Sequence, residues 1–247
     1  MSAAKTVFNW SGGKDSALAL FKMKQNPQFS IEKLLTNVNA GLDRVAMHGV
    51  RRELMTLQAE SIGLPLATLE LPENPSIEEY NDLTQQTFKS LLDEGFTDTV
   101  FGDIFLEDLK LYREEQLQPI GFNIHFPLWQ ANTRDLVLEF IELGFKAVVV
   151  CAKSELLDKS FVGRTLDKDF ISDLPENVDP CGENGEFHTF VYDGPIFKKP
   201  VPFSIGEMVF REYKAPKSIE TACPLSSETD SKRMGFWFCD LVPDCYY

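Results

Sequence analysis

The stretch FNWSGGKDS, residues 8–16, constrains the fold of this chain more than any other. It follows a short apolar run, residues 6–8, that is typical of a strand, and it precedes an apolar run, residues 17–21, that is typical of a helix start. A small turn at such a junction leaves backbone N–H groups and the positive end of the helix dipole open to a phosphate group. Gly12 and Gly13 permit the turn and a close approach of the phosphate. The stretch therefore predicts a phosphate-binding loop.

The side chains of this loop suit a phosphate that is bound together with a metal ion. Ser11 and Ser16 offer hydroxyl donors, and Lys14 offers a positive charge. Asp15 is unexpected, because a carboxylate beside a phosphate normally repels it. A magnesium ion between the two anions resolves the conflict, since Mg²⁺ prefers carboxylate and phosphate oxygens. We therefore predict that Asp15 is a metal ligand.

The loop is not a Walker A motif. That motif requires a glycine where this chain has Phe8, and a serine or threonine where it has Asp15. The run Ser-Gly-Gly-Lys-Asp-Ser instead resembles the pyrophosphate loop of the ATP pyrophosphatases, the adenine nucleotide alpha-hydrolase superfamily. This resemblance implies that the loop holds the β- and γ-phosphates of ATP while a nucleophile attacks the α-phosphorus.

Apolar runs and helical patterns alternate over the first 152 residues. This alternation predicts an α/β fold, a Rossmann-like parallel sheet with helices on both faces, followed by a smaller α+β domain over residues 153–247. The predicted strands cover residues 6–8, 31–38, 65–71, 99–104, 126–129 and 147–151, and the predicted helices start near residues 17, 51, 77, 107 and 133. A capping box of Ser76 and Glu79 marks one helix start, and Asn132 marks another.

Ligands of parallel sheets bind beyond the carboxyl ends of the strands, where the strand order reverses. The phosphate loop follows the first predicted strand, and Asn37, Gly102 and Asp103 lie at or after the ends of two others. His48 lies between the second strand and the second helix. We expect all four residues to contact the nucleotide, although His48 is equally consistent with a half-buried structural histidine.

A second polar stretch, DPCGENGEFHT at residues 179–189, is followed by Asp-Gly-Pro at 193–195. Acidic residues that flank glycines on a tight backbone can bind a metal or orient a substrate amine, but they are also consistent with a solvated glycine turn. His188 in this stretch could carry a proton near neutral pH.

The two motifs in this order resemble those of the diphthine–ammonia ligase family over residues 6–197. The chain departs from the family pattern at Asn184 and His188, and in the stretch 103–113. The resemblance implies an ATP-dependent ligase that adenylates a carboxylate, releases pyrophosphate and forms an amide with ammonia. It also implies that Ser11, Gly12, Gly13 and Ser16 hold the phosphates, that Asp15 reaches them through Mg²⁺, and that Glu183 and Glu186 shape the acceptor side. ATP and Mg²⁺ are the bound groups that it implies.

Composition narrows the range of partners. The 247 residues are 43% hydrophobic and 25% charged, which is typical of globular proteins, and the formal charge is -14. Such a charge gives no basic surface for nucleic acid, so we do not expect a nucleic-acid partner. We expect no membrane span, reduced thiols and a cytoplasmic location, and we allow for a homo-oligomer.

The five cysteines show no C-x-x-C pair. We interpret Cys151 as a core residue and Cys181 as a loop residue whose thiol can be exposed. Cys223, Cys239 and Cys245 form a weak candidate zinc site in the C-terminal stretch. The aromatic run there, residues 236–238, is expected to anchor this stretch to the body of the protein.

Two other functions remain open from the sequence. The chain could be an ATP pyrophosphatase that modifies another small acid or a tRNA. It could also be a regulatory module that binds ATP or AMP without turnover. Conversion of ATP to AMP and pyrophosphate would separate an enzyme from such a module.

Overall fold

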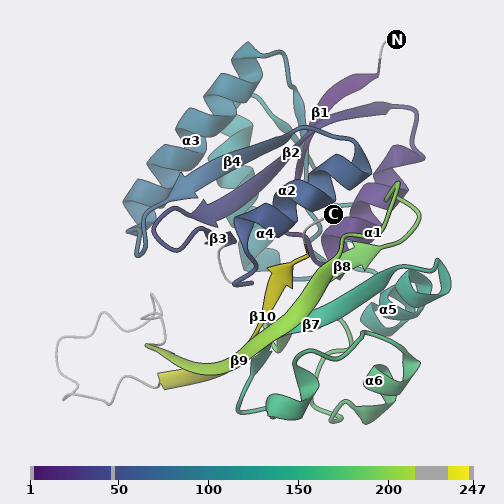
Figure 1. The fold of residues 1–247 in the computed structure, drawn as a ribbon. Helices are drawn as coiled ribbons and strands as arrows, with labels where there is room; N and C mark the ends of the chain where they lie inside the picture. Colours follow the sequence, from purple (N-terminus) through teal and green to yellow (C-terminus); the bar gives the residue numbers. More distant parts are fainter. Residues whose placement is uncertain (1–2, 46–47, 215–232, 245–247) are drawn as a thin grey trace.

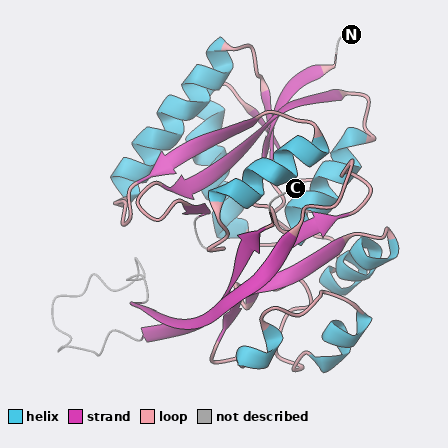
Figure 2. Cartoon of the chain, viewed as in Figure 1, coloured by secondary structure: helices cyan, strands magenta, loops and turns pink. Residues whose placement is uncertain are grey.

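The computed structural model describes residues 3–45, 48–214 and 233–244. These residues form two β-sheets with helices packed around them (Figures 1 and 2). The N-terminal sheet is parallel except for one very short strand, and the C-terminal sheet is antiparallel. This arrangement confirms the predicted α/β fold with a smaller C-terminal part.

The parallel sheet has the strand order β4–β2–β1–β5–β6. From β1, the chain first builds outward through β2 and β4, and it later builds in the opposite direction through β5 and β6. The order of the strands therefore reverses between β1 and β5, which is where ligands of such sheets bind. The strands are β1 (Ala4–Asn9), β2 (Phe29–Asn39), β4 (Leu66–Leu71), β5 (Asp98–Val100) and β6 (Asn123–His125), and β3 (Arg44–Val45) pairs antiparallel with the end of β2.

Helices cover both faces of this sheet, as predicted (Figure 1). Neighbouring residues of a strand point to opposite faces, so Val7 joins one core and Phe8 the other. The core around Val7 contains residues of α3 (Ile77–Asp93) and α4 (Glu107–Leu117). The core around Phe8 contains residues of α1 (Lys14–Lys24) and α2 (Arg52–Ile62), and it continues into the second sheet. The two cores are therefore separated by the parallel sheet.

The antiparallel sheet has the order β8–β7–β10–β9. Its strands are β7 (Lys146–Lys153), β8 (Phe187–Asp193), β9 (Phe203–Lys214) and β10 (Arg233–Pro243). β10 lies between β7 and β9, so the aromatic run at 236–238 anchors the C-terminal stretch as predicted. Helices α5 (Thr133–Glu142) and α6 (Lys168–Asp173), with the short 3-10 helices Gln118–Ile120 and Lys159–Phe161, complete the described elements.

The strand predicted at 147–151 is present, but it belongs to the antiparallel sheet and not to the parallel one. Its run of buried apolar residues correctly predicts a strand covered on both faces, but β7 pairs antiparallel with β8 and β10. A parallel central strand and an antiparallel one have the same apolar pattern when both of their faces are buried. The division of the chain at residue 152 stays a prediction.

Two other strand predictions need correction. The fifth strand is Asn123–His125, and residues 127–130 form a turn closed by a hydrogen bond from the Trp129 N–H to the Phe126 carbonyl, 3.1 Å. Pro127 has no N–H to donate to a sheet, which favours the turn. The strand predicted at 99–104 covers only Asp98–Val100.

Within the described residues, no helix combines the length and the apolar character needed to cross a membrane.

A fully buried glutamine, Gln58 on α2, ties the two sheets together. Its side-chain oxygen accepts a hydrogen bond from the Trp10 indole N–H at 2.8 Å. Its nitrogen donates to the carbonyls of Gly12 and Val191, at 3.1 and 2.6 Å. The Val191 N–H also donates to the Gly12 carbonyl at 2.9 Å. One side chain thus holds the turn after β1 against β8.

Replacing Gln58 with leucine, which has a similar size but no polar atoms, should destabilise the protein. The buried Trp10 N–H and the Val191 carbonyl would lose partners, which costs about 1–3 kcal/mol. Urea denaturation should show this loss, whereas Gln86→Leu at an exposed position of α3 should change stability by less than about 0.5 kcal/mol. Equal effects of the two substitutions would contradict this role for Gln58.

Candidate active site

Helix α1 begins at Lys14, three residues before its predicted start. Lys14, Asp15 and Ser16 therefore form the first turn of the helix, where backbone N–H groups have no acceptor within the helix. The Ser11 hydroxyl donates to Ser16 Oγ at 3.0 Å, and the Ser16 hydroxyl donates to the Gly13 carbonyl at 2.9 Å. These bonds fix the loop in a shape that suits an anion at the helix N-terminus.

Gly12 is required by the geometry of this loop. Its φ of +79° lies in the left-handed region, and a Cβ at this position would stand 2.9 Å from both Met55 and Gln58. Gly13 has a different reason to be small, because a Cβ there would lie 3.2 Å from the Thr189 carbonyl and 3.4 Å from His48. Both glycines thus allow the loop to lie tightly between α2 and β8.

Lys14 and Asp15 form an ion pair of 2.8 Å at the helix start. Burial lowers the pKa of the Lys14 ammonium, but the Asp15 carboxylate, with smaller contributions from Cys181 and Glu183, raises it by more in total, so Lys14 stays charged. Burial raises the pKa of Asp15, against the opposing effect of Lys14. The Lys14 side chain is only 5% exposed, which makes it a fixed positive charge beside the predicted phosphate position.

The polar stretch at residues 179–189, called the acidic motif from here on, contacts the phosphate loop through Thr189. The hydroxyl oxygen of Thr189, on β8, accepts a hydrogen bond from the Lys14 N–H at 3.0 Å. This side chain therefore caps α1 from another sheet, in the place of a local N-cap residue. The two stretches that the sequence singles out, 175 residues apart at this contact, form one site.

His48 and His188 lie beside the same loop, as a stacked pair with ring centroids 4.5 Å apart. Burial, with a further contribution from Lys14, lowers the pKa of His48 to about 4. Burial and the neighbouring His48 lower the pKa of His188 well below its usual value. Both rings are therefore neutral at pH 7, which argues against His188 as a proton carrier near neutral pH.

Glu183 faces the loop that follows β5. Its Oε1 accepts a hydrogen bond from the Ile104 N–H at 2.8 Å. Burial raises the pKa of Glu183 to about 7, with a smaller contribution from Asp15. This carboxyl group therefore exchanges a proton near neutral pH and is electrostatically coupled to Asp15, as expected of a group that takes part in chemistry.

Glu186 lies inside the motif rather than at its surface, with 3% exposure. Its Oε1 accepts hydrogen bonds from the Asp179 N–H and the Asn184 amide, both at 3.1 Å. Asp179 in turn accepts hydrogen bonds from the N–H groups of Cys181 and Glu183, at 2.8 and 3.2 Å. These bonds hold the turn that presents Glu183, so the geometry points to a positioning role for Glu186.

Gly102 and Asp103 follow β5, as predicted, but they have different structural roles. A Cβ on Gly102 would lie 3.1 Å from the Ser16 backbone nitrogen, so this glycine lets the loop pack against the start of α1. Asp103 is paired with Arg113 through two hydrogen bonds of 2.7 and 3.1 Å. Asn37 donates to the Tyr80 hydroxyl at 3.3 Å and lines a small cavity below the carboxyl ends of β1 and β2.

The described cysteines are structural. Cys151 is buried as predicted, and burial raises its pKa to about 12. Cys181 is also buried, with 1% exposure, so the view that its thiol can be exposed is wrong. Cys223 and Cys245 lie outside the described residues. Among the residues described, no three His, Cys, Asp or Glu side chains are grouped so as to hold a metal ion.

A magnesium site in a protein of this kind needs few protein ligands, because Mg²⁺ is usually bound by one or two carboxylates together with substrate phosphates. Asp15, in the first turn of α1, provides such a carboxylate, and the hydroxyls of Ser11 and Ser16 lie close to it in the sequence and bond to each other. These groups fit a magnesium ion that is held jointly by the protein and a nucleotide.

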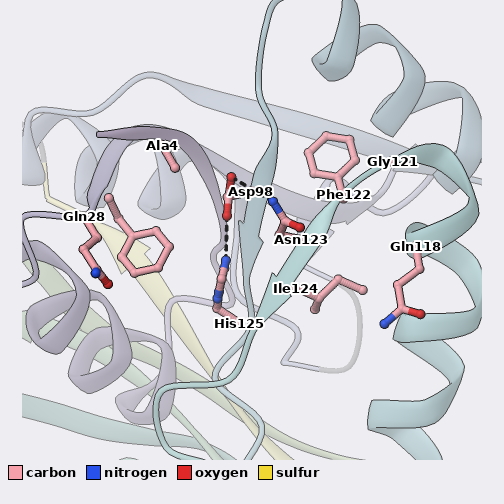
Figure 3. Close-up of a pocket in the computed structure, with 10 residues that line it drawn as sticks. Ala4, Gln28, Asp98, Gln118, Gly121, Phe122, Asn123, Ile124 and His125 are labelled. Atoms are coloured by element: carbon pink, nitrogen blue, oxygen red, sulfur yellow. Dashed lines mark hydrogen bonds and ion pairs between the residues drawn. The ribbon is translucent and has the colours of Figure 1, made fainter. Parts of the chain in front are cut away.

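A second hollow lies away from this site. It has a volume of about 760 Å³ and lies at the amino ends of β1, β5 and β6, the opposite edge of the parallel sheet (Figure 3). Asp98 and His125, 2.7 Å apart, lie within it, and the His125 ring meets Phe29 edge-on. The hydrogen bond to Asp98 and the contact with Phe29 give His125 a structural role.

Sequence reasoning missed four residues that build the site: Gln58, Asp179, Arg113 and, as a helix cap, Thr189. Gln58 carried a signal, because it occupies the apolar face of its helix, four residues from both Leu54 and Ile62. Thr189 and Asp179 lay in the recognised motif but had no assigned role. Arg113 gave no local signal, since its partner Asp103 is ten residues away.

A parallel sheet with a phosphate loop at its switch point, joined to an acidic motif from a second sheet, defines a nucleotide-binding α/β protein. Models of the diphthamide synthase N-terminal and C-terminal domains match residues 4–122 and 132–223. The chain therefore belongs to the diphthamide synthase family.

The relatives of this chain include proteins named diphthine–ammonia ligase. The human protein is 27% identical over 83% of this chain and 85% of its own length. The zebrafish (Danio rerio) protein is 28% identical over 81% of this chain and 86% of its own length. The fission yeast (Schizosaccharomyces pombe) protein is 24% identical over 81% of this chain but only 36% of its own length.

The raised pKa of Glu183 predicts a pH-dependent stability. Between about pH 4.5 and pH 7 the folded carboxyl binds more protons than the unfolded one, so the free energy of unfolding falls as the pH rises. Glu183→Gln should remove this fall in the free energy of unfolding. The fall amounts to at most about 2 kcal/mol, because solvent screens a partly exposed carboxyl group. Urea denaturation of both proteins at about pH 5 and about pH 8, without nucleotide, measures the difference. Parallel pH profiles would show that Glu183 titrates normally.

Proposed function

We propose that this chain is an ATP-dependent ligase that joins ammonia to a substrate carboxylate and releases AMP and diphosphate. The observation that carries the proposal is the hydrogen bond between Thr189 of the acidic motif and the first N–H of the phosphate-loop helix. It joins a nucleotide-binding loop and a carboxyl group with a pKa of about 7 in one site. Membership of a family whose relatives are named diphthine–ammonia ligase supports the same chemistry.

The proposed reaction has two steps. A carboxylate oxygen of the acceptor attacks the α-phosphorus of ATP, and the bond to the pyrophosphate oxygen breaks. The nitrogen of ammonia then attacks the acyl carbon, AMP leaves, and one proton is released. Adenylation is needed because a free carboxylate is a poor acyl donor, whereas AMP is a good leaving group.

The residues of the loop stabilise the leaving pyrophosphate. In our proposal Lys14 supplies a fixed charge, and the N–H groups of Asp15 and Ser16 donate hydrogen bonds to phosphate oxygens, because the Lys14 N–H is bonded to Thr189. Asp15 would hold Mg²⁺, which supplies further positive charge to the pyrophosphate when bound. Ser11 and Ser16 keep the loop in shape through their hydroxyl bonds.

The acidic motif would serve the acceptor side. Glu183 is partly ionised at neutral pH, so it can accept the proton that the attacking ammonia loses. Neutral His188 and His48 can orient an acceptor or a phosphate oxygen without adding charge.

We propose that the chain is divided into an ATP-binding part up to residue 152 and an acceptor part from residue 153. The start of β7 at Lys146 favours a boundary a few residues earlier. Cytoplasmic location, oligomeric state and lack of a nucleic-acid partner stay predictions.

Product analysis tests this function directly. The protein is incubated with α-labelled ATP, Mg²⁺ and ammonium, with and without a metabolite or protein extract from its host. We expect labelled AMP that increases with extract, because the acceptor carboxylate is the nucleophile. Labelled ADP would contradict the proposal. Tight ATP binding without turnover in any extract would favour the regulatory module, and stimulation by tRNA alone would favour the tRNA alternative.

Replacing Asp15 with asparagine should lower AMP formation on the order of 10²-fold or more, since metal-assisted charge stabilisation contributes several kcal/mol. ATP binding in the absence of metal should change little, because the helix N-terminus and Lys14 remain. Asp135→Asn, an exposed carboxylate in the first turn of α5, is the matched control and should keep full activity. Full activity of Asp15→Asn would remove Asp15 from the metal site.

A further inference from the structure

A small cavity lies on the α3/α4 side of the parallel sheet, beneath the carboxyl ends of β1 and β2. Its volume is about 30 Å³, measured as the space open to the centres of water-sized molecules. That is enough for one or two such molecules, because one needs about 10–15 Å³ on this measure. It is far too small for a nucleotide or an acyl group. Its walls include Asn9, Asn37, Thr84, Arg113 and Gln116.

Two polar atoms of this wall are buried without a partner. Thr84 is 8% exposed, and its hydroxyl has no hydrogen-bond partner among the described residues; nor, within that same part of the chain, does the side-chain oxygen of Gln116. Buried polar groups are nearly always satisfied, and leaving one unpaired costs about 1–3 kcal/mol. Two lining residues that each carry such an atom indicate that the cavity holds a small molecule that donates and accepts hydrogen bonds.

The cavity adjoins the candidate active site. Asn9 is the last residue of β1, two residues before Ser11 of the phosphate loop. Arg113 lines the cavity while its guanidinium pairs with Asp103, next to the glycine that packs on the start of α1. Ile104, the next residue, donates its N–H to Glu183. A single loop, residues 102–104, therefore separates the cavity from the phosphate loop and from Glu183.

We propose that this cavity binds ammonia, the co-substrate of the proposed ligase, and the inference rests on that function. Ammonia is the size of water and offers three N–H donors and one lone pair. It can donate to the Gln116 carbonyl oxygen and accept a hydrogen bond from the Thr84 hydroxyl. The described residues that line the cavity include no carboxylate to balance a cation, and Arg113 is already paired with Asp103. A buried charge without a partner is costly, so the bound species is neutral ammonia and the proton of ammonium stays in solvent.

Thr84→Val keeps the shape of the side chain and removes its hydroxyl, and Gln116→Met does the same for the amide. The matched control is Thr87→Val, one turn along α3, whose hydroxyl donates to the Leu83 carbonyl and does not line the cavity. The rate of AMP formation is measured against ammonium concentration, with the acceptor-containing extract fraction and α-labelled ATP. Thr84→Val and Gln116→Met should raise the KM for ammonium about 3- to 10-fold each, with kcat and the KM for ATP unchanged.

A second measurement needs no acceptor. Thermal unfolding is followed at alkaline pH in equal concentrations of ammonium chloride and sodium chloride. The unmodified protein and Thr87→Val should be stabilised more by the ammonium salt, since a ligand that binds only the folded state raises its stability. Thr84→Val should lose this difference.

The outcomes separate the two proposals. If the unmodified protein forms AMP but the cavity variants keep its KM for ammonium, the cavity is a site for structural water and our inference is wrong. Ammonium-specific stabilisation that depends on Thr84, in a protein that forms no AMP with any extract, would retain the ammonia site and reject the ligase. Absence of both effects would reject both.

Discussion

The site depends on one buried contact region, where the turn after β1 meets β8. Gln58 bridges the Gly12 and Val191 carbonyls, the Val191 N–H bonds to Gly12, and Thr189 caps the helix that follows. These groups are buried, so each bond is strongly preferred over an unpaired alternative. A phosphate loop on a parallel sheet needs no second sheet to bind an anion. Here, however, its conformation is fixed by the strand that also carries the acidic motif.

The same contact explains the electrostatics of the site. The chain carries a net charge of -14, yet an ATP site must attract a polyanion. Lys14 is held as a buried charge by Asp15, and the helix N-terminus adds partial positive charge at the same point. Burial raises the pKa of Glu183 to about 7, so this carboxyl group near the loop is only partly ionised at neutral pH. Local burial therefore counters the overall acidity of the chain where the phosphate would bind.

Most of the fold, and much of the site, could be predicted from local patterns. The strand–loop–helix at residues 6–21, the capping box of α3 and the Asn132 cap of α5 each depend on a few neighbouring residues, and each is present. The assignment of β7 failed because a run of buried apolar residues indicates burial and not which strands lie beside it. The Thr189 cap and the Arg113–Asp103 pair could not be predicted either, since both depend on tertiary contacts. Burial of the His48–His188 pair likewise follows from the meeting of β8 with the loop after β3.

The two faces of the parallel sheet have different environments, and this bears on how a ligase could order its reactants. On one face, α1 and α2 pack against the second sheet, which brings the acidic motif to the phosphate loop. On the other face, α3 and α4 enclose the small cavity within a separate core. In the proposed reaction the acceptor would meet ATP from the first face and ammonia would arrive from the second, past residues 102–104. An acyl-adenylate is readily hydrolysed by water. Ammonia that is already bound in a specific cavity, close to the carboxyl edge of the sheet, therefore favours amide formation over hydrolysis of the acyl-adenylate.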